Sequence, residues 1–180
     1  ISVIFASIHG FDTESDMHQD DIEEIAMKKS DFDGALTKAI EDCGGQIDKI
    51  IRGFFMATFG TTNATKEDPV LALLGGMKMC EIAEELGVEV HVGVNTGYAW
   101  VGQIKTERTV DTTVIGDAVN LSARLKTQAA KNQVVCSPDT YEASKDYFDY
   151  EVLRELPPGT LKGIERSMTV YEPMAASEKA

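Results

Sequence analysis

The chain has 180 residues, 43% of them hydrophobic and 26% charged, which is the composition of a folded domain rather than of a disordered segment. Its 30 acidic and 17 basic residues give a formal net charge of -13, which argues against a general surface for nucleic acids or anionic membranes. No apolar run approaches the roughly 18 residues of a membrane-spanning helix, and no signal peptide is visible. A phosphate-bearing ligand would therefore need a local basic pocket.

Three cysteines, Cys43, Cys80 and Cys136, lie in apolar segments without the spacing of a metal site. We expect reduced, buried thiols, which suit a cytoplasmic location. The chain opens directly in an apolar strand pattern without an initiating Met, so we expect it to be a domain of a longer protein.

The first part of the chain predicts a strand and a long helical region. Residues 1–8 are nearly all apolar and rich in β-formers, as in a buried central strand. Between about residues 20 and 43, apolar residues recur at helical spacing. This pattern predicts one long helix, or two in series with a break near Gly34.

A hairpin and a second helix are predicted next. Residues 46–59 have the pattern of a β-hairpin whose turn lies near Arg52 and Gly53, since glycine tolerates the positive φ of such a turn. Pro69 suits the first turn of the following helix, and Gly87 suits its end.

Strand patterns dominate the middle of the chain. Residues 88–94 predict a strand, and residues 97–103 are expected to pair with it across a tight turn. Residues 105–111 are charged and predict an exposed segment, after which residues 112–115 are expected to return to the same sheet. Trp100 could lie in the core or in a subunit interface, and burial preferences favour the core.

The segment Thr113–Leu125 reads TVIGDAVNLSARL and predicts a strand end, a turn at Gly116 and a helix capped by Asp117. Asn120 and Arg124 lie four residues apart, so an amide and a guanidinium should project together near the helix N-terminus, where a polyanion could be held. The alternative is an amphipathic helix with two solvated polar residues. The apolar residues of this helix should face a core: Ala118, Leu121, Leu125 and Ala129.

The rest of the chain predicts a strand at residues 133–136, a helix that starts at Pro138, and strands around residues 150–156 and 168–171. Residues 173–180 have the character of a frayed tail. The order of the elements predicts one α+β domain, with helices packed on a mainly antiparallel sheet.

The segment TVIGDAVNLSARL also resembles the signature of class III nucleotidyl cyclases, the adenylate and guanylate cyclases. Other segments match this family in the same order: VIFASIHGF from Val3, GGQIDKIIRGFFMATFG from Gly44, VGVNTGYAWVGQI from Val92, and LKGI near the end. The resemblance covers residues 1–172 and implies a cyclase homology domain with a ferredoxin-like core.

The resemblance implies a reaction in which the ribose 3′-hydroxyl of a nucleoside triphosphate attacks its own α-phosphate, helped by two divalent cations held on two aspartates. The first aspartate belongs in the family's FADI, where this chain reads FASI with Ser7. The second belongs in IGD, where this chain has Arg52 and then Gly53. Nearby carboxylates occupy no matching position: Asp12, Asp16 and Asp48. We therefore expect no metal in the isolated domain, and Mg²⁺ or Mn²⁺ only where a partner supplies the aspartates.

Five other family residues are retained, and their roles are those that the resemblance implies. Lys49 matches the base-reading lysine, and Thr113 matches its partner in adenylate cyclases. Asn120 matches the ribose-orienting asparagine, and Arg124 matches the arginine that stabilises charge on the transferring phosphate. Lys162 matches a triphosphate-contacting lysine. Taken singly, each would be better explained as a strand or surface residue, but together they favour the family.

In this family each site lies between two domains of a head-to-tail dimer. The chain keeps the base- and transition-state-recognising set and lacks the metal set. It resembles in this respect the second catalytic half of mammalian transmembrane adenylyl cyclases, which also reads FASI. The resemblance implies a homodimer, or a heterodimer with another cyclase domain, formed through the hairpin and residues 105–111.

Two hypotheses follow from this division. The first is a non-catalytic pseudo-cyclase that dimerises and can bind nucleotide. The second is half of a heterodimeric adenylate cyclase that converts ATP to cyclic AMP and pyrophosphate. Catalysis by a homodimer is a third. ATP is a possible ligand under each, and neither nucleic acid nor a membrane is an expected partner of the domain itself.

Overall fold

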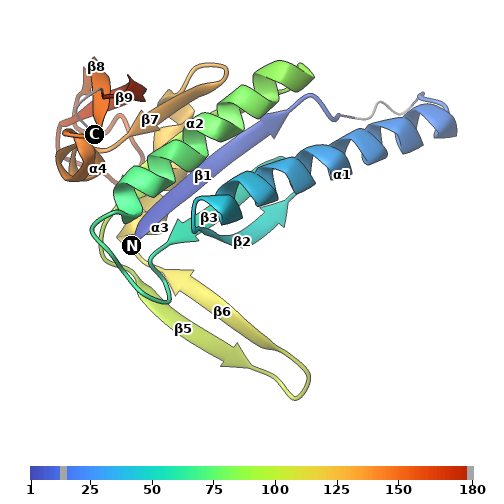
Figure 1. Ribbon diagram of the computed structural model, residues 1–180, viewed down its shortest axis with the longest axis horizontal. Coiled ribbons are helices and arrows are strands. Elements are labelled where there is room, and N and C mark those ends of the chain that lie inside the picture. The colour runs from blue at the N-terminus through green and yellow to red at the C-terminus, as the bar shows by residue number, and fades with distance from the viewer. Residues whose placement is uncertain (13–15, 178–180) are drawn as a thin grey trace.

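The computed structural model describes residues 1–12 and 16–177 of the chain. Figure 1 shows how its helices and strands are arranged. In chain order they are β1 (Ser2–His9), α1 (Gln19–Asp42), β2 (Gln46–Ile51), β3 (Phe54–Phe59), α2 (Asp68–Leu86), β4 (Glu89–Thr96), β5 (Trp100–Lys105), β6 (Val110–Ile115), α3 (Asp117–Leu125), the 3-10 helix η1 (Lys126–Gln128), β7 (Gln133–Cys136), α4 (Pro138–Ser144), β8 (Phe148–Leu156) and β9 (Met168–Ala176).

Seven strands form one sheet in the order β2-β3-β1-β4-β7-β9-β8. Neighbouring strands are antiparallel except for β4 and β7, which are parallel. β1 lies between β3 and β4, so the predicted central strand is confirmed. The hairpin that turns at Arg52 and Gly53 is confirmed as β2 and β3, and the second helix ends at Gly87 as predicted. The α+β prediction with a mainly antiparallel sheet is therefore confirmed.

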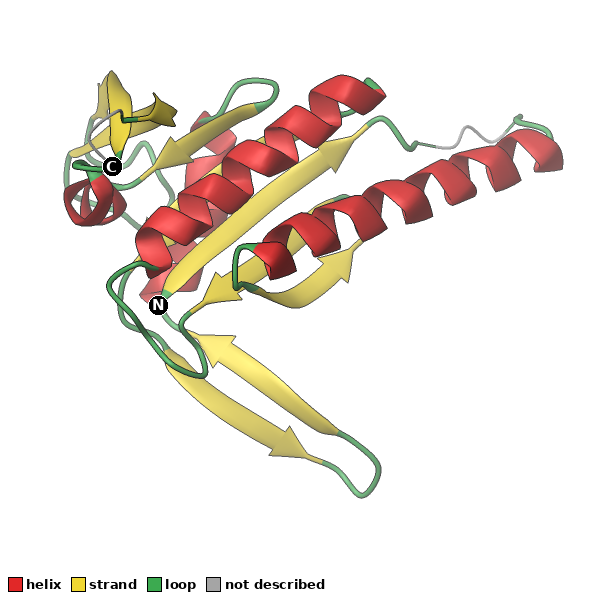
Figure 2. Ribbon diagram, viewed as in Figure 1, coloured by secondary structure: helices red, strands yellow, loops and turns green. Residues whose placement is uncertain are grey.

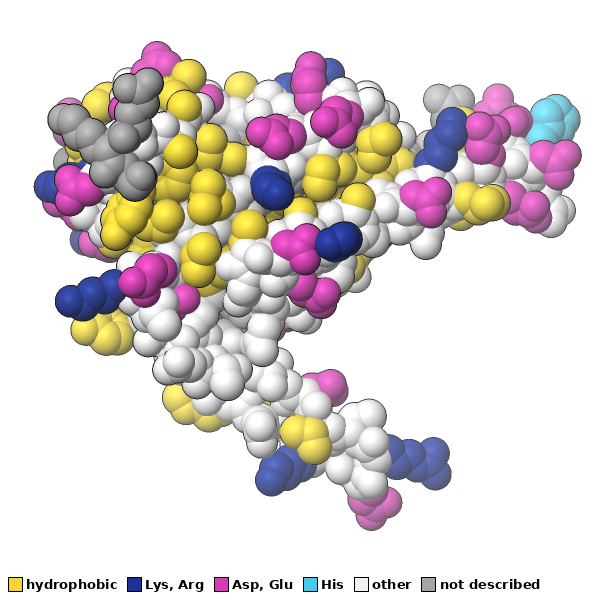
Figure 3. Space-filling view, in the orientation of Figure 1, with side chains coloured by type: hydrophobic (Ala, Val, Ile, Leu, Met, Phe, Trp, Pro, Cys, Tyr) yellow, Lys and Arg dark blue, Asp and Glu magenta, His cyan; other side chains and the backbone are white. Residues whose placement is uncertain are grey.

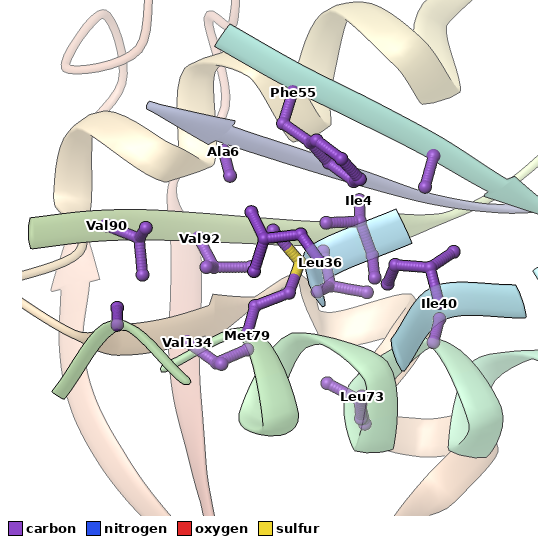
Figure 4. Close-up of a cluster of buried hydrophobic side chains, with 14 of the residues drawn as sticks. Ile4, Ala6, Leu36, Ile40, Phe55, Leu73, Met79, Val90, Val92 and Val134 are labelled. Atoms are coloured by element: carbon purple, nitrogen blue, oxygen red, sulfur yellow. The ribbon is translucent and has the colours of Figure 1, made fainter. Parts of the chain in front are cut away.

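Helices cover both faces of the sheet (Figure 2). Alternate side chains of β1 face opposite layers, because successive residues of a strand point to opposite sides. Ile4 and Ala6 join the larger core cluster with α1 and α2, whereas Val3 and Phe5 pack in a cluster with Ala118 of α3. Figure 4 shows side chains of the larger cluster: Ile4, Ala6, Leu36, Ile40, Phe55, Leu73, Met79, Val90, Val92 and Val134.

Gly93 fixes how closely α3 and η1 approach the sheet. A Cβ atom at Gly93 would lie 2.5 Å from the backbone nitrogen of Lys126 and would also collide with the carbonyl oxygen of Ser122. Only glycine therefore lets the end of α3 rest directly on β4. The predicted apolar face of α3 is buried against this layer, which confirms its orientation: Ala118, Leu121, Leu125 and Ala129.

The expected pairing of residues 97–103 with the preceding strand is wrong. β5 pairs with β6 instead, and the two form a separate ribbon that projects from the body (Figure 1). The reason is that both edges of β4 are already occupied, by β1 on one side and β7 on the other. Residues 112–115 likewise do not return to the main sheet.

Trp100 is also misplaced by the sequence prediction. Its side chain lies over Gly102 of the same strand and is 63% exposed, not buried in the core. In the part of the chain that the structure describes, β5 and β6 pair only with each other. A two-stranded ribbon offers too little packed surface to bury Trp100 in a core of its own.

The first helical region is one continuous helix, α1, without a break at Gly34, which confirms the first of the two predicted alternatives. Two smaller expectations differ from the structure. Gly116, not Asp117, occupies the N-cap of α3, and Asp117 is the first helical residue. The tail is ordered further than expected, because β9 continues to Ala176 and pairs with Phe148 of β8. Residues 178–180 of the expected tail lie outside the described residues.

The three cysteines are free thiols. Cys136 is buried as expected, whereas Cys43 and Cys80 are half-buried. Burial raises the pKa of Cys80 to about 12, so this thiol stays protonated at neutral pH. No helix among the described residues is both long and apolar enough to cross a membrane.

Candidate functional site

Asn120 and Arg124 lie one helical turn apart on α3 and line the same cleft, as their spacing predicted. The cleft has a volume of about 980 Å³. Its walls come from the end of β4, from α3, and from residues 163–166. Asn120 is exposed and Arg124 is half-buried, so both can meet a molecule that enters the cleft.

The start of α3 is tied to β4 by one buried hydrogen bond. Asn95, which is 3% exposed, donates from Nδ2 to the carbonyl oxygen of Ala118 at 3.1 Å. This bond fixes the first turn of α3, from which Asn120 projects. Leu121 and Leu125 anchor the same helix through its apolar face. The cleft wall that carries Asn120 and Arg124 is therefore rigidly placed relative to the sheet.

The charges in the cleft are nearly balanced. Two arginines line it together with three carboxylates: Arg124, Arg166, Asp117, Asp139 and Glu165. A triphosphate carries several negative charges, so this cleft alone does not supply the excess of positive charge that such a ligand requires.

The other three predicted binding residues lie outside the cleft lining. Lys49 is exposed on β2, with its Nζ atom 3.6 Å from Oδ2 of Asp48. Lys162 is exposed beside Gly163, which does line the cleft. Thr113 lies on the ribbon. Within one chain, the structure thus brings Asn120 and Arg124 together and leaves the other three residues apart from them.

Thr113 shares one face of the ribbon with exposed apolar side chains. In the β5–β6 register it lies opposite Gly102, next to the pairs Trp100–Ile115 and Ile104–Asp111. Cross-strand partners point to the same side of a sheet. Trp100, Ile104 and Ile115 are each more than half exposed, so Thr113 lies within an apolar face that no element of the described chain covers.

Ser7 and Gly53 line a second cavity, of about 500 Å³. The backbone nitrogen of Ile8 donates to the carbonyl oxygen of Gly53 at 2.9 Å, which holds the end of β1 against the hairpin turn. The two positions that the family resemblance assigns to metal-binding aspartates are therefore neighbours in space. Gly53 has a φ of +78°, as the predicted turn requires.

This second cavity does not fit a divalent cation. Ser7 offers a neutral hydroxyl and Gly53 offers no side chain, whereas hard cations require several oxygen ligands, usually with carboxylates among them. Arg52 and Lys126 add positive charge to the lining, where Asp12 is the one carboxylate among the described residues. No group of three or more potential metal-ligating side chains occurs in the described parts of the chain.

Lys126 is a residue of this cavity that the sequence prediction missed. Its Nζ atom lies 4.9 Å from the centre of the Phe54 ring and 5.9 Å from that of Phe5. Burial lowers the pKa of the Lys126 ammonium. The only signal in the sequence was a second basic residue just after Arg124, and nothing there indicated that Lys126 lines this cavity while Arg124 lines the cleft.

Residues 1–172 match the family described as "Adenylate and Guanylate cyclase catalytic domain". The chain is 30% identical over 182 residues to the terminal-differentiation-specific adenylate cyclase of Dictyostelium discoideum. That match covers 96% of this chain but 8% of the relative, so the chain spans a small part of the relative's length.

Two solved structures share the fold. The adenylyl cyclase CyaB from P. aeruginosa superposes with a TM-score of 0.82 at 24% identity, over 99% of this chain and 95% of that one. The guanylyl cyclase Cya2 superposes with a TM-score of 0.85 at 24% identity, over 98% and 92% of the two chains. One neighbour is an adenylyl and the other a guanylyl cyclase, so the fold itself does not select the base.

Proposed function

The chain belongs to the family of adenylate and guanylate cyclase catalytic domains, and from that premise we propose that it is a pseudo-cyclase in cyclic AMP signalling. It pairs with a second cyclase domain and makes no cyclic nucleotide by itself. The cavity at Ser7 and Gly53 carries this proposal, because it has neither of the two carboxylates that would hold the catalytic cations. Arg52 and Lys126 repel any cation that approaches.

The cleft at Asn120 and Arg124 favours a second candidate function, half of a heterodimeric adenylate cyclase. In this proposal a partner domain holds the cations, and this chain orients the ribose with Asn120. Arg124 offers a fixed fork of donors to the phosphate as its charge develops. Lys49 and Thr113 read adenine, and Lys162 contacts the triphosphate. The partner also supplies the positive charge that the balanced cleft lacks.

Pairing with another domain is supported by the exposed apolar face of the ribbon. Trp100, Ile104 and Ile115 expose large apolar side chains there. A contiguous apolar surface of this kind marks an interaction site. A homodimer or a heterodimer would place Thr113 at the contact between the two domains. The free thiols are compatible with a cytoplasmic location, which is part of this proposal.

A cyclase assay tests the proposal and separates its two forms. The purified chain is incubated with ATP and Mn²⁺, alone and mixed with a cyclase domain that keeps both aspartates but has its own equivalent of Arg124 replaced by Ala. The pseudo-cyclase makes no cyclic AMP in either sample. The half-enzyme makes it only in the mixture. Metal-dependent cyclic AMP from the chain alone, reproduced across preparations, contradicts both forms.

A further inference from the structure

A small polar pocket lies between β6 and the edge of the main sheet, and we call it the β2–β6 pocket. Its volume is about 230 Å³. Its walls come from residues 46–48 of β2, Thr58 of β3, Thr61 in the loop that follows, and residues 110–112 and Val114 of β6. The pocket is smaller than the pockets of roughly 300–1,000 Å³ that enclose drug-sized ligands, so it suits an end group rather than a whole nucleotide.

A β-bulge places Asp48 in the wall of this pocket. In the pairing of β2 with β3, Ile47 lies opposite Ala57 and Lys49 lies opposite Met56, so Asp48 is an extra residue without a partner on β3. A bulge redirects a side chain, and bulges are common at the edges of sheets and beside binding sites. β2 is an edge strand. The side chain of Asp48 is 9% exposed and lines the pocket.

The carboxylate of Asp48 has no hydrogen-bond donor within the described chain. Its ion-pair contact is with Lys49, whose Nζ atom lies 3.6 Å from Oδ2 of Asp48, which is longer than a hydrogen bond. The Lys49 side chain is mostly exposed, and exposed ion pairs contribute little. A carboxylate that is largely removed from water gains strongly from a donor that a ligand supplies.

Thr58 is a second polar side chain of the pocket that lacks a partner. The residue is 2% exposed, and its hydroxyl makes no hydrogen bond with another described residue. Thr58 lies opposite Gln46 in the β2–β3 pairing, so both side chains point to the same face. The Gln46 amide is already engaged, because Thr61 donates from Oγ1 to its Oε1 atom at 2.6 Å. Buried hydroxyls are normally hydrogen-bonded, so the Thr58 hydroxyl is available to a molecule in the pocket.

The charge of the pocket favours a cation. Asp111 adds a second carboxylate to the wall and forms no ion pair with a described residue. The described residues of the lining include no lysine or arginine. Val110 and Val114 add apolar surface that suits a short alkyl stem. Acceptors beside an apolar wall match a guanidinium or an ammonium group, which offers only donors.

We propose that the β2–β6 pocket binds a small organic cation that carries N–H donors, a guanidinium or a primary ammonium group. Asp48 and Asp111 supply the opposite charge, and Thr58 accepts a further hydrogen bond. The pocket shares no described residue with the cleft of Asn120 and Arg124. The site therefore goes beyond the proposed function, and its failure would leave that function untouched.

An NMR titration of the isotopically labelled full chain with methylguanidinium tests the proposal at constant ionic strength. We expect saturable shifts of the backbone amides of Asp48, Thr58 and Asp111, with one cation bound per chain. Tetramethylammonium carries the same charge without an N–H donor and should leave these amides in place. The absence of saturable shifts, or equal shifts with both cations, overturns the proposal.

Charge variants separate this pocket from the general attraction of an acidic protein for cations. Asp48→Asn should weaken methylguanidinium binding by roughly tenfold or more, as expected for loss of one charge-assisted contact. Asp149→Asn is the matched control, because it removes the same charge from an exposed residue of β8, outside the pocket. It should bind as the unchanged chain does. Equal weakening in the two variants would mean that no particular carboxylate holds the cation.

Thr58→Val distinguishes a ligand contact from a packing role. The substitution replaces the unpartnered hydroxyl with a methyl group of similar shape, so the Tm of the free chain should not fall. Binding of methylguanidinium should nevertheless weaken by roughly threefold, as expected for loss of one hydrogen bond. A variant that melts at a lower temperature and binds methylguanidinium as tightly as before would contradict this role for the hydroxyl.

Two further measurements identify the source of the cation. In sedimentation, saturating methylguanidinium should dissociate paired chains if an arginine or lysine side chain of a second copy fills the pocket. Unchanged association identifies a free amine as the occupant. Adenosine is neutral and should not compete with methylguanidinium. Adenosine that shifts the same amides and displaces the cation would show that the pocket takes a neutral base, which overturns the proposal.

Discussion

Arg124 lies directly against Gly163: a Cβ atom on that glycine would come within 2.9 Å of Nη1 of Arg124. Gly163 also has a φ of +79°. The loop after β8 therefore sets the position of the guanidinium in the cleft, and the absence of a side chain at Gly163 is what gives Arg124 its place.

Gly163→Ala should displace Arg124 rather than unfold the domain, because the obstructed atom is the end of a flexible side chain. Gly159→Ala is the matched control, since it has a φ of +83° and open space around its Cα. Both should lose roughly 1–2 kcal/mol of stability from the left-handed backbone. If the chain is half of an adenylate cyclase, only Gly163→Ala should lower cyclic AMP formation in the mixed dimer. Equal activity in the two variants, at equal thermal stability, would show that the contact does not position Arg124.

Restoring the aspartates should create a metal site only if the nearby charge is also removed. Ser7→Asp with Gly53→Asp supplies two carboxylates, and aspartate tolerates the positive φ at Gly53 better than most residues. Adding Arg52→Gly should strengthen Mn²⁺ binding by about tenfold over the double variant, because a like charge next to the cation is lost. Calorimetric titration with Mn²⁺ measures the affinity of the double variant and that of the triple variant. Equal affinities would mean that Arg52 points away from the cavity.

In the half-enzyme form of the proposal, Arg124 and Lys49 should affect different steps in the mixed dimer. Arg124→Ala should lower turnover by about 10²–10³-fold with little change in KM, because its bond strengthens as phosphate charge develops. Arg124→Lys keeps the positive charge but loses the planar fork of donors, so its turnover should lie between those of the unchanged chain and Arg124→Ala. The assay is steady-state kinetics with ATP. A change in KM alone would assign Arg124 to ground-state binding.

If the chain is half of an adenylate cyclase, Lys49→Glu should reduce the preference of the mixed dimer for ATP over GTP. Lysine donates to a ring nitrogen of adenine. Guanine presents an N–H in that place, so the lysine ammonium and the guanine N–H would be two donors facing each other. We expect the ratio of kcat/KM values to fall by about tenfold or more. Competition between the two nucleotides in the mixed dimer measures this ratio. An unchanged ratio would leave Lys49 as an exposed strand lysine with no part in base selection.

Trp100→Ser should weaken self-association, because a large exposed aromatic residue at the centre of an interface contributes strongly to binding. The expected loss is roughly tenfold or more in the dimerisation constant, measured by sedimentation across a concentration series. Met27→Ser is the control, since Met27 is 70% exposed but lies on α1, away from the ribbon. High salt should favour the dimer by screening the charge of -13 on each chain. A strict monomer at high protein concentration and high salt would exclude this interface.

The elements were largely predictable because their local signals agreed with the packing. The nearly continuous apolar run of β1, Gly87 after α2 and the apolar stripe of α3 each indicate the structure that is observed. The ribbon was not predictable, because strand pairing depends on which edges of β4 remain free. That is decided by β7, which follows about 40 residues later. Trp100 was misplaced for the same reason.

The candidate site was likewise predictable only in part. Asn120 and Arg124 share a cleft because their spacing is that of one helical turn, which a sequence reveals. Ser7 and Gly53 were found through the family motifs, and their proximity then follows from the pairing of β1 with β3. Lys126 was missed because its position depends on the contact of η1 with Gly93. A single glycine in a strand does not indicate which element will pack against it.

The ribbon also has a mechanical consequence. Its two ends enter the body side by side, since a Cβ atom on Gly116 would lie 3.2 Å from the Cα of Ala99. One end continues from β4 and the other into α3, and residues of both elements line the cleft. Figure 3 shows the ribbon standing clear of the body. The ribbon is joined to the cleft only through residues 97–99 and Gly116. A partner domain bound at the far end of the ribbon would therefore be connected to the residues beside Asn120 by two short links of the same chain.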